Sequence, residues 1–438
     1  MTAPSTPAPT PPPPELPVTR QPGFWRLIGL AILLGIFGAF FSLAFLAIIG
    51  KGGHWWHLSN VKWGGGHWWW VAVTAAAGIA VGVLRHFTKL PWETPGLVED
   101  LEAEHVEPKL VPGILLVSLA SLVGGASLGP EKPLGSGGGW AAGWLARRYK
   151  LDNDDAGITT LAGFAGAYGG FFSAAIINVA LIMELANPGG KKYVKALVAT
   201  IVATAISFGI YFAIAGAIFV DYYKIPPFVY HGWELLAGVG FGVLAAVLVL
   251  ILGIVMSVSK AIFLRMKLPG TAKSAIGGIV FGLVGVLLPL TMFTGTDQLK
   301  TVIDGKVALG AGLLAALVIG KMITFAVCNT SGFVGGPIFP ALFIGGTAGE
   351  TVHALFHSVP LGLAFTCVMA AVPGGLVSAP FSFVLMVAFL TQVGALQTAP
   401  ILLAVITSFL IVGGVKYLIA LRQAHAAAGG VSAAPASG

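Results

Sequence analysis

Charged residues are scarce in this chain. Only 9% of its 438 residues are Asp, Glu, Lys or Arg, whereas 56% are hydrophobic and the mean hydropathy is +0.90. This composition excludes an ordinary soluble domain, in which about 25% of residues are charged. Several apolar runs exceed the roughly 18 residues that an α-helix needs to cross a bilayer. The sequence therefore predicts a multi-pass integral membrane protein surrounded by lipid.

Cysteine is nearly absent. Cys328 and Cys367 are isolated in apolar segments, which excludes a disulfide framework and favours packing roles for both. His353 and His357 have the i, i+4 spacing of metal ligands, but no HExxH motif or nearby acid pair completes a site. We therefore interpret these histidines as part of an interfacial helix face, and we expect no metal, no cofactor and no enzymatic activity.

The basic residues give a net charge of +7, but they lie in short clusters between apolar runs, such as Arg147-Arg148 and Lys191-Lys192. Loop clusters of this kind are better explained by membrane orientation than by phosphate binding, so no nucleic-acid partner is expected. Arg20 and Arg26 flank the first apolar run and favour a cytoplasmic amino terminus.

The two ends of the chain have few large apolar side chains. Residues 1–22 are proline-rich and residues 423–438 are rich in Ala, Gly and Ser, so neither end can bury enough surface to offset its ordering entropy. We expect disordered tails there. Between them we expect two membrane repeats, 23–225 and 226–422.

Glycine and proline, by contrast, are plentiful and follow a repeated pattern. Gly129-Pro130 is echoed by Gly336-Pro337 roughly 207 positions later, and Gly169-Gly170 is echoed by Gly374-Gly375 roughly 205 positions later. Two nearly equal offsets indicate an internal duplication. We predict an all-α membrane fold of two antiparallel, inverted-topology repeats, whose broken helices meet near the bilayer midplane.

The Gly-Pro pairs predict the chemistry of the meeting point. Proline pre-sets a helical dihedral angle in a first turn, and glycine lets a ligand approach the backbone closely. The free amides of that first turn, with the positive end of the helix dipole, form an anion site. Two such helix starts would bind a dehydrated anion through partial charges alone. A permanent full positive charge would hold the anion too tightly for conduction.

These motifs carry a resemblance to a known family. Gly129-Pro130, Gly169–Ala174 leading to Glu184, Gly335–Leu342 and Val377–Pro380 occur in the order typical of the CLC chloride channel and transporter family. The resemblance covers nearly the whole chain between the tails and looks like that of a divergent bacterial-type member. It implies a homodimer with one pore per subunit in a bacterial inner or plasma membrane, with chloride, or else nitrate or another halide, as substrate.

The resemblance also shows where this sequence departs from the family. Leu128 stands where the family usually has its gating glutamate, and Leu185 stands where exchangers commonly have their internal proton glutamate. Glu184 matches the widespread glutamate before it. The resemblance therefore implies that the usual gate and proton relay are both absent.

The family motif also implies the pore residues. Pro340 matches the motif proline and places the amides of Ile338 and Phe339 beside the pore, next to the two Gly-Pro pairs. Thr94 is the nearest match to a family position where serine favours chloride and proline favours nitrate, and it leaves the anion undecided. Tyr417 is the one candidate for the pore tyrosine, and aligning it requires a gap.

Three acids lie in strongly apolar sequence: Glu131, Glu184 and Glu350. A charge at the centre of a membrane helix costs about 2.5 to 3.5 kcal/mol even on the lenient scale, so each is a functional candidate. Glu131, three residues after Leu128, either substitutes as a displaced gate or pairs with Lys132 or an arginine. Glu184, near Lys191 and Lys192, is interpreted as structural.

The prediction is a passive CLC-like channel, mainly for chloride. The alternative is a proton-coupled antiporter that uses Glu131. An organic-anion permease ranks lower because it would need a wide pore and an arginine in the core segments, and an intramembrane enzyme ranks lower because no set of reactive groups is visible.

Overall fold

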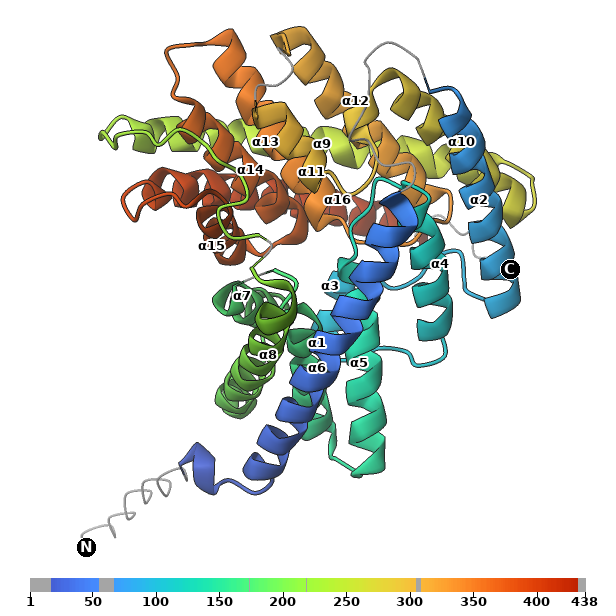
Figure 1. The fold of residues 1–438 in the computed structure, drawn as a ribbon, viewed down its shortest axis with the longest axis vertical. Helices are drawn as coiled ribbons and strands as arrows, with labels where there is room; N and C mark the ends of the chain where they lie inside the picture. Colours follow the sequence, from blue (N-terminus) through green and yellow to red (C-terminus); the bar gives the residue numbers. More distant parts are fainter. Residues whose placement is uncertain (1–16, 55–66, 173, 218, 305–308, 432–438) are drawn as a thin grey trace, which may run out of the picture.

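The computed structural model describes residues 17–54, 67–172, 174–217, 219–304 and 309–431, and every regular element in these parts is helical (Figure 1). The all-α prediction is confirmed. The α-helices are α1 (Phe24–His54), α2 (Trp69–Thr88), α3 (Leu97–Glu102), α4 (Val111–Val123), α5 (Glu131–Arg148), α6 (Asn153–Gly169), α7 (Ala175–Ala186), α8 (Tyr193–Ala215), α9 (Glu234–Arg265), α10 (Gly270–Leu287), α11 (Thr296–Ile303), α12 (Ala311–Thr330), α13 (Ile338–Leu355), α14 (Leu361–Val377), α15 (Pro380–Thr391) and α16 (Thr398–Val431). Short 3-10 helices are η1 (Val18–Arg20), η3 (Gly190–Lys192) and η4 (Pro289–Thr291).

Seven of the described helices are long and apolar enough to cross a membrane: α1, α2, α8, α9, α10, α12 and α16. Others are too short. At about 1.5 Å per residue, the 12-residue helices α7 and α15 are roughly 18 Å long, well under the roughly 30 Å of a hydrocarbon core. The chain therefore combines full spans with broken helices, as the repeated Gly and Pro positions predicted.

The repeated motifs mark equivalent helix boundaries. Helices α5 and α13 each begin directly after a Gly-Pro pair, with Pro130 and Pro337 at the N-caps. Helices α7 and α15 each follow a Gly-Gly pair, although Ser173 of the first copy lies outside the described residues. The sequence repeat is thus also a repeat of helix starts.

Glycine sets the helix packing. In Figure 1, α1, α5, α6 and α8 gather in the lower part and α9, α13, α14 and α16 in the upper part, while α2 lies beside α10. A Cβ atom at Gly78 of α2 would overlap the backbone of Ser274 in α10, and one at Gly138 of α5 would overlap the carbonyl of Gly163 in α6. Small residues at these crossings let backbones approach closely, which is the usual way that helices associate in lipid.

Parts of the two expected tails lie within the described residues. Residues 1–16 and 432–438 lie outside the described residues, and η1 occupies the last part of the segment 1–22. Helix α16 continues to Val431, past the expected boundary at residue 422. Alanine is the best helix former, so the alanine-rich sequence after residue 423 can extend a helix without burying surface.

Candidate anion-binding site

The two Gly-Pro helix starts meet at a two-residue antiparallel bridge. The amide of Gly129 donates to the carbonyl of Gly336 at 2.8 Å, and the amide of Gly336 donates to the carbonyl of Gly129 at 2.6 Å. Helices α5 and α13 begin two residues after these glycines. The first turns of both helices, with their unpaired amides and positive dipole ends, are therefore brought together.

The carboxylate of Glu131 lies at this meeting point. Glu131 is the first residue of α5 and is fully buried. Its Oε1 accepts a hydrogen bond from the amide of Phe339, in the first turn of α13, at 3.0 Å, and the amide of Ile338 also contributes to binding it. Within the described parts of the chain, Oε2 has no hydrogen-bond partner. The side chain of one helix start thus occupies the amide donors of the other, the donors predicted for an anion.

Glu131 does not pair with the neighbouring lysine, so that expectation is wrong. Lys132 points the other way and forms a 2.5 Å ion pair with Asp100 of α3, with both side chains at most 7% exposed. Among the described residues, Glu131 forms no ion pair with an arginine either. Its carboxylate is held by main-chain amides alone, which carry only partial charges.

The bridging glycines are required by the position of this carboxylate. A Cβ atom built on Gly129 or on Gly336 would overlap the Glu131 carboxylate. Any other residue would therefore compete with the group that occupies the site.

Aromatic side chains surround the first turn of α13. The rings of Phe171, Phe172 and Phe219 lie 5.4, 6.0 and 5.6 Å from the ring of Phe339. The hydroxyl of Tyr168 donates to the main-chain carbonyl of Glu131 at 2.7 Å. These contacts hold the two helix starts in place and put an apolar surface against the first turn of α13.

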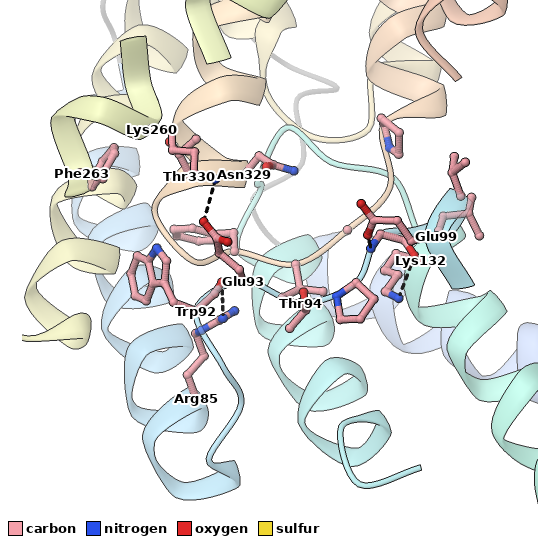
Figure 2. A pocket seen from close by; sticks show the side chains of 18 of the residues that line it. Arg85, Trp92, Glu93, Thr94, Glu99, Lys132, Lys260, Phe263, Asn329 and Thr330 are labelled. Atoms are coloured by element: carbon pink, nitrogen blue, oxygen red, sulfur yellow. Dashed lines mark hydrogen bonds and ion pairs between the residues drawn. The ribbon is translucent and has the colours of Figure 1, made fainter. Parts of the chain in front are cut away.

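A cavity of about 470 Å³, here called the polar cavity, reaches the site beside Gly335 and Pro337. Figure 2 shows Arg85 near the loop that carries Trp92, Glu93 and Thr94, with Lys260 and Lys132 also in the lining. Thr94 thus lines the approach to the site without touching the Gly129–Gly336 bridge. The Lys260–Glu93 ion pair, at 2.7 Å, joins α9 to this loop.

A second cavity of about 310 Å³, here called the aromatic cavity, reaches the site beside Pro130 and Phe339. It shares no lining residue with the polar cavity. Tyr222 and Asp297 lie in its lining, and the Tyr222 hydroxyl donates to Asp297. Burial, and then the negative charge of Asp297, raise the pKa of Tyr222, so the phenol remains a donor.

The two leucines at the family's carboxylate positions line neither cavity. Leu128 is fully buried, and a Cβ atom at Gly335 would press against its side chain. Leu185, in α7, is 6% exposed. Tyr417, on α16, is 65% exposed and lines neither cavity, so it is not brought to the site. Pro340 is buried in the first turn of α13.

Glu184 lies away from the bridge and caps another helix. Its carboxylate accepts from the amide of Phe381 at 2.8 Å, and from the amide and hydroxyl of Ser382 at 2.9 and 2.6 Å. The contact joins the end of α7 to the start of α15. A structural role was expected beside Lys191 and Lys192, and the structure corrects the partner to the first turn of α15.

We expect Glu184→Ala to destabilise the protein, because it leaves the amides of Phe381 and Ser382 without their acceptor. Hydrogen bonds to a charged group contribute about 1.5 to 3 kcal/mol each. Thermal unfolding in detergent should show a lower Tm for Glu184→Ala and a smaller loss for Glu184→Gln, which keeps one acceptor oxygen. Equal melting of all three proteins would contradict a capping role.

The remaining candidates are peripheral. Glu350 is partly buried in α13, and Nδ1 of His353 lies 2.7 Å from the carbonyl of Val359 in the following loop. His357 is exposed just beyond that helix. Within the described residues, no group of three or more His, Cys, Asp or Glu side chains could hold a metal ion.

Sequence reasoning missed Arg85, the Lys132–Asp100 pair and the Lys260–Glu93 pair. Arg85 follows an apolar run, a position typical of an interfacial charge, and no arginine was seen in the core segments. Its 5% exposure shows that it is instead buried beside a cavity. The signal that could have found it was its isolation from any acid nearby in sequence.

The chain is similar in sequence to proteins named for ion transport. A protein named for ion transport, YfeO, from Salmonella newport (strain SL254), is 28% identical over 310 residues, or 68% of this chain and 72% of the relative. The relative from Salmonella choleraesuis (strain SC-B67) matches to the same extent.

Solved structures share the fold. A slow cyanobacterial Cl⁻/H⁺ antiporter matches with a TM-score of 0.75 at 20% identity, over 92% of this chain and 98% of that one. A CLC-type fluoride/proton antiporter matches with a TM-score of 0.73 at 18% identity, over 91% and 97%. The family model for voltage gated chloride channels matches residues 93–413, a range that contains both Gly-Pro helix starts and Glu131. The chain therefore belongs to the voltage gated chloride channel family.

Proposed function

We propose that this protein exchanges an inorganic anion, chiefly chloride, for protons, with Glu131 as a gate displaced into the first turn of α5. The observation that carries the proposal is the 3.0 Å hydrogen bond from the Phe339 amide to the Glu131 carboxylate. The group that can take up a proton sits on the donors that an anion would use.

Competition at these donors is the proposed mechanism. An ionised Glu131 binds the amides of α13 and excludes an anion of like charge. Protonation neutralises the carboxyl group, which then accepts hydrogen bonds less strongly and leaves the amides to the anion. The polar cavity is lined by Gly335 and Pro337 and the aromatic cavity by Pro130 and Phe339, so in this mechanism the anion approaches the bridge from the two cavities in turn.

The site suits reversible binding. Main-chain amides at helix starts attract an anion through partial charges, so an anion is held without an ion pair that would trap it. Glu131 likewise forms no ion pair among the described residues, so its carboxylate can leave the amides of α13 as readily as an anion can.

Several further features are proposals on the same basis. The names of the two solved antiporters above support proton coupling and a halide substrate; nitrate is the alternative anion. We also propose a homodimer in a bacterial inner membrane, with a cytoplasmic amino terminus. Apolar side chains exposed on the broken helices, such as Ile176 of α7 and Phe381 of α15, are available to a second copy or to lipid. We also propose that the protein is a transport protein and not an enzyme.

A passive channel is the second candidate. It is favoured by Leu128 and Leu185, which cannot take up a proton and stand where the resemblance places the family's carboxylates. In such a channel Glu131 would act as a plug, and proton movement would not accompany anion flux.

One experiment separates the two. Proteoliposomes loaded with chloride and given an outward gradient are followed with chloride and proton electrodes together. Exchange predicts proton uptake in fixed ratio to chloride release, and uphill proton movement when the pH gradient opposes it. Chloride release without proton movement would favour the channel, and no release of chloride, nitrate or fluoride would contradict anion transport.

A further inference from the structure

Arg85 joins the two loops that enclose the polar cavity. It lies near the end of α2 and is 5% exposed. Its Nη1 donates to the carbonyl of Gly332 at 2.9 Å, and its Nη2 donates to the carbonyl of Trp92 at 2.8 Å and also to that of Pro91. One guanidinium thus ties the loop that carries Thr94 to the loop that leads into α13, and Figure 2 shows the first of these contacts, beside Trp92.

The charge of Arg85 is not cancelled by a carboxylate. Its acceptors are neutral carbonyl groups, and in the described parts of the chain no carboxylate oxygen lies within 4.0 Å of it. The two lysines in the cavity lining are each paired, Lys132 with Asp100 and Lys260 with Glu93. A guanidinium does not lose its proton in proteins, so Arg85 is a fixed, buried positive charge.

Glu99 is the cavity's remaining carboxylate, and it opposes Arg85 weakly. Its side chain is exposed and accepts from the amide of Gly96 at the start of α3. Exposed charges are screened by water and salt, whereas a buried charge acts through a medium of lower dielectric constant. The field of Arg85 in the cavity therefore exceeds that of Glu99.

We propose that Arg85 is a positioning residue for anion transport, which draws anions into the polar cavity by its uncompensated charge and holds the loops on both sides of the approach to Gly335 and Pro337. Both Nη atoms donate to carbonyls, and the buried Nε has no hydrogen-bond partner within the described residues, so Arg85 acts on the anion mainly through its charge. This inference rests on the proposed function, in which anions reach the amides of Ile338 and Phe339 through this cavity.

The charge and the hydrogen bonds can be tested separately. Arg85→Lys keeps the charge but loses the planar fork that reaches three carbonyls, and Arg85→Gln loses the charge. Lys260→Gln is the matched control, because it also removes a positive charge from the lining of the polar cavity. The Lys260 side chain, unlike that of Arg85, is 55% exposed and is paired with Glu93. Chloride transport is measured against chloride concentration in proteoliposomes, with Tm measured for each protein.

We expect Arg85→Gln to raise the KM for chloride about tenfold with a smaller change in maximal rate, as befits the loss of a buried charge at low dielectric. Arg85→Lys should keep KM within about twofold of the wild type but lower Tm, since one ammonium cannot replace the fork. Lys260→Gln should change KM by less than about twofold, as for other exposed pairs.

An unchanged KM in Arg85→Gln, or an equal rise in the Lys and Gln variants, would overturn the electrostatic role. If Arg85→Gln does not fold, Arg85→Lys decides, because a tenfold rise in its KM would contradict the proposal. If the wild type moves no anion, the proposed function fails, and chloride binding in detergent still reports on Arg85: its Kd should rise in Arg85→Gln, and an equal Kd would sink the inference.

Discussion

Glu131→Gln is expected to abolish proton movement while chloride still flows. Glutamine has nearly the same shape and keeps an oxygen that can accept from the Phe339 amide, but it cannot take up a proton. Because Glu131 is the carboxylate that meets the amides of α13, its loss should remove proton coupling at its source. The pH dependence should disappear with it.

The sign of that pH dependence follows from the competition. In the wild type, lowering the pH protonates the carboxylate, frees the amides and should increase chloride flux. In Glu131→Gln the side chain is always neutral, so chloride flux should be constant over the pH range in which a carboxyl group titrates. Glu350→Gln is the control, since it makes the same chemical change in α13 away from the bridge.

Two results would decide against this view. Undiminished proton movement in Glu131→Gln would show that another group carries the proton. Chloride flux in the wild type that ignores pH and moves no protons would support the passive channel, with Glu131 as a plug that the anion displaces.

Much of the fold was predictable because its main signal is local. Helix starts at Gly129-Pro130 and Gly336-Pro337 follow from what proline does to the first turn, and their near-equal spacing with the Gly-Gly pairs revealed the duplication. The number of spans was harder. The repeated Gly and Pro positions indicated that helices are broken, but apolar runs do not show where each helix ends, so the 12-residue lengths of α7 and α15 become visible only in the structure.

The site was predictable only in part, because its decisive contacts are remote in sequence. The Glu131 side chain reaches an amide 208 residues away, and Glu184 reaches one 197 residues away. From sequence position alone, the role of Glu131 as a displaced gate could not be distinguished from a role as the ion-pair partner of Lys132 or an arginine. Arg85 was missed for the same reason, since Gly332, one of its acceptors, is 247 residues away.

Gly336→Val is expected to abolish anion transport while leaving the protein assembled. The first atom added, Cβ, would overlap the carboxylate of Glu131 and would lie 2.9 Å from the Glu131 Cβ, so the side chain must move aside and the start of α5 must shift slightly. The added methyl groups would then occupy the space beside the amides of Ile338 and Phe339. An overpacked site costs about 1 to 3 kcal/mol, so the fold should persist with a lower Tm while the anion loses its place.

Gly413→Val in α16 is the matched control, because a Cβ atom there would meet no atom within 4 Å. It should leave both Tm and chloride flux near the wild-type values. Size-exclusion chromatography in detergent establishes assembly, and chloride efflux from liposomes measures transport. The space beside these amides is already filled by the Glu131 side chain, so it cannot hold both a valine side chain and an anion. A Gly336→Val protein that conducts chloride at the wild-type rate would therefore show that the anion passes elsewhere.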